Sequence, residues 1–92
     1  MSDRIMTLHP QGKAGVNIDK AKYDAVARAI IDLIQARGEM LFGDLPDAVG
    51  QRLPDFDGSV GWYTTTVKLD LEARGMIERA PGKGPQRLRL VN

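Results

Sequence analysis

The sequence contains no cysteine and only one histidine among its 92 residues. Without cysteine, the chain can form neither a disulfide framework nor a thiolate metal site. One histidine is also too few for the common zinc sites. His9 lies beside Pro10, where a solvated or lightly packed side chain is the simpler interpretation. We therefore expect no metal and no other cofactor, with stability supplied by the packing of helices.

Long apolar runs are absent as well. No stretch approaches the roughly 20 apolar residues that span a bilayer, and the N-terminus lacks the apolar core of a signal peptide. A chain of this length forms one small domain with a single core. The sequence therefore predicts a cytoplasmic protein with no membrane partner.

No recognisable catalytic arrangement is present. The acidic residues between positions 44 and 57 do not have the spacing of a calcium loop, and no pair of carboxylates stands out among them. The segment from Gly12 to Gly15 has glycines and a lysine but lacks the spacing of a phosphate-binding loop. We therefore expect neither an enzyme nor a site for a small-molecule ligand.

The net charge is only +1, but it is unevenly distributed. Residues 23–58 contain seven acidic residues against three arginines, and residues 1–22 contain a small excess of cations. The last 17 residues contain four cations and a single acid, Glu78. These cations are Arg79, Lys83, Arg87 and Arg89. Because opposite charges attract, a polyanion should meet the ends of the chain.

The apolar pattern predicts three helices. Asp19 can cap the first, which extends to about Arg37 before Gly38 and has one apolar stripe. Residues 39–45 are typical of a short strand that leads into a second helix, with Asp44 or Asp47 as its cap. The third helix begins after Ser59 and ends before Gly75. Its inner face is predicted to comprise Val60, Tyr63 or Thr64, Val67 and Leu71.

A basic hairpin is predicted after the third helix. Residues 76–80 form a strand and residues 81–85 a loop rich in glycine and proline. Residues 86–91 alternate polar and apolar, which is typical of a half-buried strand. Leu88 and Leu90 should point one way, and Arg87 and Arg89 the other.

The order of elements from Lys20 to Val91 is similar to that of winged helix-turn-helix regulators, and the segment LDLEARGMIER resembles their junction between the third helix and the wing. The segments IMTLHPQGK, GVNI, WYTTTVKLDLEARGMIER and PQRLRL resemble a small bacterial family of unknown function that is predicted to be winged-helix. The resemblance implies an α+β fold with three helices and a small antiparallel sheet. On this basis residues 19–92 form the winged-helix domain, and residues 1–18 form an extended N-terminal arm.

The arm contains breakers of regular structure, yet Ile5, Met6 and Leu8 are too apolar for a freely solvated tail. We expect it to dock on the domain or on a second subunit. The alternative is a basic arm that lies in the minor groove of DNA.

The resemblance implies a dimeric, DNA-binding transcriptional regulator whose partner is double-stranded DNA. Phosphate contacts from the wing would supply most of the affinity. By the resemblance, the candidate DNA contacts are Ser59, Thr65, Thr66 and Lys68 on the recognition helix, and Lys83, Arg87 and Arg89 on the wing. Arg79 is a further candidate, because it belongs to the cluster of four cations in the last 17 residues.

The outer face of the third helix supports a different hypothesis. A face that reads bases usually carries Arg, Lys, Asn, Gln or Ser, because these side chains match the groups on base edges. Here Asp70 and Glu72 flank an outer face that is largely apolar, and phosphates would repel both acids. The alternative function is a protein-interaction or dimerisation module without DNA binding. Its predicted surface consists of Trp62, Leu69 and Ala73.

Overall fold

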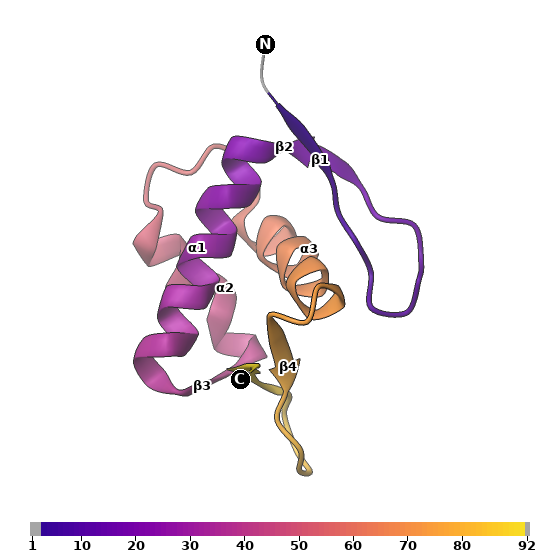
Figure 1. The fold of residues 1–92 in the computed structure, drawn as a ribbon. Helices are drawn as coiled ribbons and strands as arrows, with labels where there is room; N and C mark the ends of the chain where they lie inside the picture. Colours follow the sequence, from indigo (N-terminus) through magenta and orange to yellow (C-terminus); the bar gives the residue numbers. More distant parts are fainter. Residues whose placement is uncertain (1–2, 92) are drawn as a thin grey trace.

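The computed structural model describes residues 3–91 as an α+β fold with three helices and two small antiparallel sheets (Figure 1). This is the winged-helix-like arrangement expected from the sequence. The helices are α1 (Lys20–Arg37), α2 (Leu45–Arg52) and α3 (Val60–Ala73), with a short 3-10 helix, η1 (Phe42–Asp44), before α2. The strands are β1 (Arg4–Met6), β2 (Asn17–Asp19), β3 (Glu39–Leu41), β4 (Ile77–Arg79) and β5 (Arg87–Leu90).

Helix α1 is the central support of the core. The carboxylate of Asp19 accepts a hydrogen bond from the N–H of Ala21 at 2.8 Å, so the predicted cap is confirmed. The helix ends at Gly38, whose φ of +81° suits glycine best because that conformation is unfavourable for other residues. The apolar stripe of α1 packs against α2, α3 and β5. Its members at the centre of the core, Ile30 and Ile34, are inaccessible to solvent.

Helix α3 also begins where the sequence predicts. The hydroxyl of Ser59 accepts the N–H of Trp62 at 3.2 Å, and Gly75 follows the helix with a φ of +76°. Of the two alternatives for the inner face, Thr64 is fully buried, whereas Tyr63 is half-buried. Tyr63 packs edge-on between the rings of Phe56 and Trp62. Tyr63 therefore packs against the edge of the core at the start of the helix, whereas Thr64 lies within it.

The three-stranded sheet has the order β3-β5-β4, with both pairs antiparallel. The short strand predicted after α1 is therefore present as β3, and it pairs with strand β5 of the wing. Leu88 of β5 is completely buried in the core, and the loop between β4 and β5 projects away from the helices (Figure 1).

The N-terminal arm docks on the domain, but it is a hairpin rather than a single extended segment. Strand β1 pairs with β2 in antiparallel register, with Ile5 opposite Ile18, and β2 leads directly into α1. Ile18 is 4% exposed and belongs to the core, which holds the base of the hairpin in place. The loop of the hairpin lies beside α3 (Figure 1).

Candidate interaction surface

The wing presents two exposed cations on the part of the structure that was expected to contact phosphates. Strand β5 alternates as predicted: Leu88 faces the core and Arg87 faces solvent. Lys83 lies in the exposed loop between β4 and β5. Within residues 3–91, neither Arg87 nor Lys83 has an ion-pair partner. Both side chains are therefore available to an anion.

The other two cations of the predicted cluster are placed differently. Arg79 lies opposite Leu88 in the register of β4 and β5, so it shares the face of the sheet that carries the core leucine. Its guanidinium lies 3.8 Å from the carboxylate of Glu72 on α3. Arg89 is on the same face as Arg87, but it donates a hydrogen bond to Glu78 at 2.6 Å. The four cations thus do not share one face of the wing. Two of them, Arg79 and Arg89, already lie beside carboxylates.

The position of Lys68 corrects a second expectation. This residue was expected among the DNA contacts of α3, but its side chain is 3% exposed. The ammonium group pairs with Glu72 one turn further along the helix, and it lies 4.8 Å from the centre of the Phe42 ring. A buried ammonium requires such partners because burial removes its hydration. Lys68 therefore joins η1 to α3 and is not available to a phosphate.

The remaining predicted residues of α3 are divided between solvent and the hairpin. Ser59 and Thr65 are exposed, and the Ser59 hydroxyl is occupied by the helix cap. Trp62 is 47% exposed. Thr66, Leu69 and Ala73, further along the outer face, are half-buried. The outer face is thus open at its start and partly covered towards its end.

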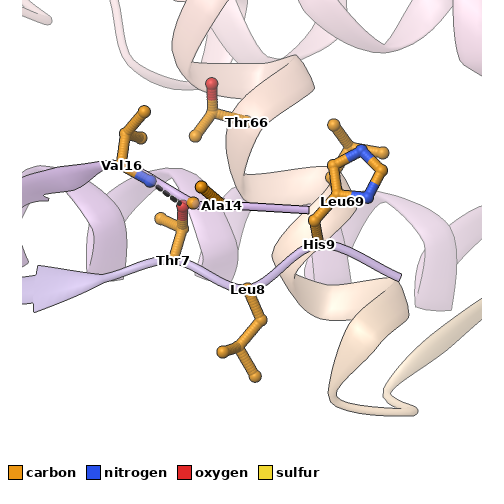
Figure 2. A pocket seen from close by; sticks show the side chains of 8 residues that line it. Thr7, Leu8, His9, Ala14, Val16, Thr66 and Leu69 are labelled. Carbon is orange, nitrogen blue, oxygen red and sulfur yellow. Dashed lines mark hydrogen bonds between the residues drawn. The ribbon is translucent and has the colours of Figure 1, made fainter. Parts of the chain in front are cut away.

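A shallow cavity of about 110 Å³ lies where the hairpin meets α3. Thr66 and Leu69 line it from the helix, and Leu8 and Val16 are among the hairpin residues around it. Figure 2 shows that the N–H of Val16 donates to the hydroxyl of Thr7 across the hairpin, at 2.9 Å. The Leu8 side chain points away from Val16 and Thr66 in this view (Figure 2). The cavity is open to solvent and much smaller than the roughly 300–1,000 Å³ of a typical ligand pocket, so a single small side chain suits it better than a ligand does.

Asp70 is a key residue whose role the sequence did not reveal. It was expected on an exposed flank of α3, but it is completely buried. One carboxylate oxygen accepts the backbone N–H of Leu8 at 2.8 Å. The other accepts the hydroxyl of Tyr23 and the Nε of Arg74, the latter at 2.8 Å. Helical spacing alone could not distinguish an exposed acid from one that accepts two of its three donors from distant parts of the chain.

This network changes the acid–base properties of its members. Burial, followed by the hydrogen bond to Asp70, raises the pKa of Tyr23 to about 12. The hydrogen bond to Asp70 also raises the pKa of Arg74. Tyr23 therefore remains a neutral donor and Arg74 a charged one at any physiological pH. The hydrogen bonds place the hairpin, α1 and α3 around one carboxylate.

Two further structural observations concern the described residues. No helix among them is both long enough and apolar enough to cross a membrane. Residues 3–91 also contain no group of three or more His, Asp or Glu side chains suitable for holding a metal ion.

Comparison with known proteins places the chain in a family without assigning it an activity. Neither a curated protein nor a solved structure shows significant similarity to it. Residues 4–88, which include the hairpin, all three helices and most of the sheet, match a family of unknown function, DUF6958. The chain belongs to this family of unknown function.

Proposed function

We propose that this chain is a small winged-helix protein that acts as a protein-interaction module and pairs with a second copy of itself. The observation that carries the proposal is the position of the N-terminal hairpin. It partly covers the outer face of α3, which a base-reading helix must keep free to enter the major groove. The same region of the surface leaves large apolar side chains exposed.

The exposed apolar residues favour an interface. Trp62 is 47% exposed, Leu8 44% and Val16 37%, and all three belong to the hairpin or to α3. Tryptophan is among the residues that most often anchor protein interfaces, because it combines a large apolar area with one hydrogen-bond donor. Val16 and Leu69 border the cavity that begins one helical turn beyond Trp62. The surface formed by Val16, Trp62 and Leu69 is called the hairpin–α3 face below. Leu8 lies at its edge, because its side chain points away from Val16 and Thr66 (Figure 2).

A second copy is a suitable partner for the hairpin–α3 face because this face carries complementary features. A two-fold interface brings the same patch of both chains together, so a protrusion on one chain must fit a recess on the other. At the edge of this face, the exposed side chain of Leu8 provides an aliphatic protrusion. The cavity beside Leu69 provides a recess for a small aliphatic group. The net charge of +1 also means that two copies repel each other only weakly.

Self-association is tested by measuring the mass of the protein by light scattering over a range of concentrations. We expect the unmodified chain to form a dimer and Trp62→Asp to form a monomer, because the aspartate would place a charge in an apolar interface. Met76→Asp is the matched control, since Met76 is 45% exposed but follows the other end of α3. A monomeric unmodified chain at high concentration would exclude the proposal. So would equal loss of the dimer in both variants.

A second candidate function is binding of the DNA backbone by the wing. The specific observation in its favour is that Arg87 and Lys83 are exposed and, among the described residues, without carboxylate partners. Such contacts would follow phosphates without reading the sequence of bases. Titration of a fluorescent DNA duplex at low salt tests this function. A lack of binding under these conditions would rule it out.

A further inference from the structure

The N-terminal hairpin is attached to the domain unequally at its two ends. Its strands form a separate two-stranded sheet that does not join the sheet of the wing. At the base, Ile18 is buried and Ile5 packs against the core. Residues 7–16 lie beyond this base. Leu8 bonds to Asp70 of α3, and residues 7–9 and 14–16 line the cavity beside the helix. A two-stranded hairpin is marginally stable by itself in water, so the outer part depends on its contacts with the helix.

One polar contact joins this outer part to α3. The backbone N–H of Leu8 donates to Asp70 across 62 positions of sequence. Within residues 3–91, it is the only hydrogen bond between residues 7–16 and the helix. A bond from an amide to a carboxylate is stronger than one between two neutral groups. Elsewhere the hairpin and α3 face each other across the cavity, whose lining includes Thr7 and Val16 from the hairpin and Thr66 and Leu69 from the helix.

The hydrogen bond between Leu8 and Asp70 can break without disturbing the other partners of Asp70. Tyr23 and Arg74 bind the oxygen that does not bind Leu8, and neither belongs to the hairpin. If residues 7–16 move away, Asp70 keeps these two partners and its other oxygen gains access to water. The carboxylate is therefore not left buried without partners when the hairpin opens. Opening removes the hydrogen bond to Asp70 and exposes Thr7, which is 3% exposed in the closed state. The core stays intact, because its cluster of buried apolar residues contains none from 7–16.

We propose that residues 7–16 form a displaceable cover over the outer face of α3, held closed by the bond between Leu8 and Asp70. In the open state, Thr66 and Leu69 become exposed and extend the apolar stripe that starts at Trp62. This inference goes beyond self-association, because the cover opens within a single chain. It is therefore tested under conditions in which light scattering shows a monomer.

The test uses thiol labelling, for which the absence of cysteine from the chain is an advantage. Leu69→Cys places a thiol beneath the cover, and the rate of its reaction with a soluble disulfide reagent is measured in two backgrounds. Leu8→Pro removes the N–H that binds Asp70, whereas Leu8→Ala shortens the same side chain and keeps the N–H. We expect labelling to be at least tenfold faster with Leu8→Pro than with Leu8→Ala. Equal rates would overturn the proposal.

A second reporter separates local opening from unfolding of the whole chain. Ala29→Cys places the thiol in the core face of α1, where Ala29 is 5% exposed. Its labelling rate should be the same in both backgrounds. If it rises as much as the rate at position 69, the hairpin does not open independently and the proposal is wrong.

Gly15→Ala provides an independent way to open the cover. A Cβ at position 15 would lie 1.7 Å from the carbonyl oxygen of Thr7, so the two sides of the hairpin could not remain in their present positions. We expect this variant to accelerate labelling at position 69 by at least tenfold and to leave position 29 unchanged. No selective acceleration in this variant would also contradict the proposal.

Discussion

At the scale of the residue, Asp70 determines how three parts of the chain meet. Its buried carboxylate accepts donors from Leu8 in the hairpin, Tyr23 in α1 and Arg74 after α3. Removing one donor from a buried carboxylate leaves part of its charge unsatisfied, which costs more than an exposed hydrogen bond would. The network therefore contributes to the relative placement of these elements as well as to stability.

Tyr23 should make the stability of the protein depend on alkaline pH. Its pKa is about 12 in the folded protein and near 10 in an unfolded chain, so the folded state favours the protonated phenol. This contribution is complete below pH 10 and is lost as the pH rises towards 12. Over that range the free energy of unfolding should fall by up to about 3 kcal/mol more in the unmodified chain than in Tyr23→Phe. Urea unfolding at several pH values measures the difference, and parallel curves for the two proteins would contradict the assignment.

At the scale of the element, the period of two along a strand explains why the wing is less cationic than its composition indicates. Arg87 and Arg89 alternate with core leucines and share one face. Arg79 is in phase with Ile77, which is buried, so it lies on the opposite face near Glu72. A count of cations in the last 17 residues cannot show that they lie on two faces of the sheet, because the face of each residue depends on how the strands pair.

The wing should accordingly contribute two phosphate contacts rather than four if it binds DNA. The logarithm of the binding constant should then fall against the logarithm of salt concentration with a slope of about −1.8 per chain. Arg87→Ala should bring this slope to about −0.9, because one fewer counterion is released. Arg89→Ala is the matched control, since Arg89 already pairs with Glu78 and its loss should change the slope much less. Fluorescence anisotropy at several salt concentrations measures each slope, and equal effects of the two substitutions would refute this assignment.

At the scale of the whole molecule, exposed apolar residues lie in two places. One group belongs to the hairpin and to α3, and it includes Leu8, Val16 and Trp62. The other consists of Met76 and Val91, which meet at the base of the wing through the bond from the Val91 N–H to the Met76 carbonyl at 3.1 Å. The first group contains more exposed side chains, and it borders the cavity between the hairpin and α3. This difference is the reason for placing the interface on the hairpin–α3 face.

A dimer also predicts that thermal stability depends on protein concentration. Association stabilises the folded state by mass action, so a hundredfold increase in concentration should raise the melting temperature by about 5–10 °C. Trp62→Asp should abolish this dependence, whereas Met76→Asp should retain it. Calorimetry at low and high concentration provides the measurement. A melting temperature that does not change with concentration in the unmodified chain would contradict self-association.

The sequence by itself determined the elements whose signals are local. The caps at Asp19 and Ser59, the end of α1 at Gly38 and the alternation along β5 all depend on interactions between residues close in the chain. These features predicted the three helices and the two strands of the wing. The family match supports the closer resemblance without adding a function.

Only the tertiary structure decided which side chains form the candidate surface. Lys68 and Asp70 were both expected on accessible sides of α3, but Phe42 covers the first and the hairpin and α1 enclose the second. Such burial depends on contacts between residues up to 62 positions apart, and helical periodicity contains no information about them. The outer face of α3 was identified from the sequence as apolar. The structure alone showed that the N-terminal hairpin of the same chain lies over part of this face. The sequence could not show this, because docking on the same chain and docking on a second chain require the same residues.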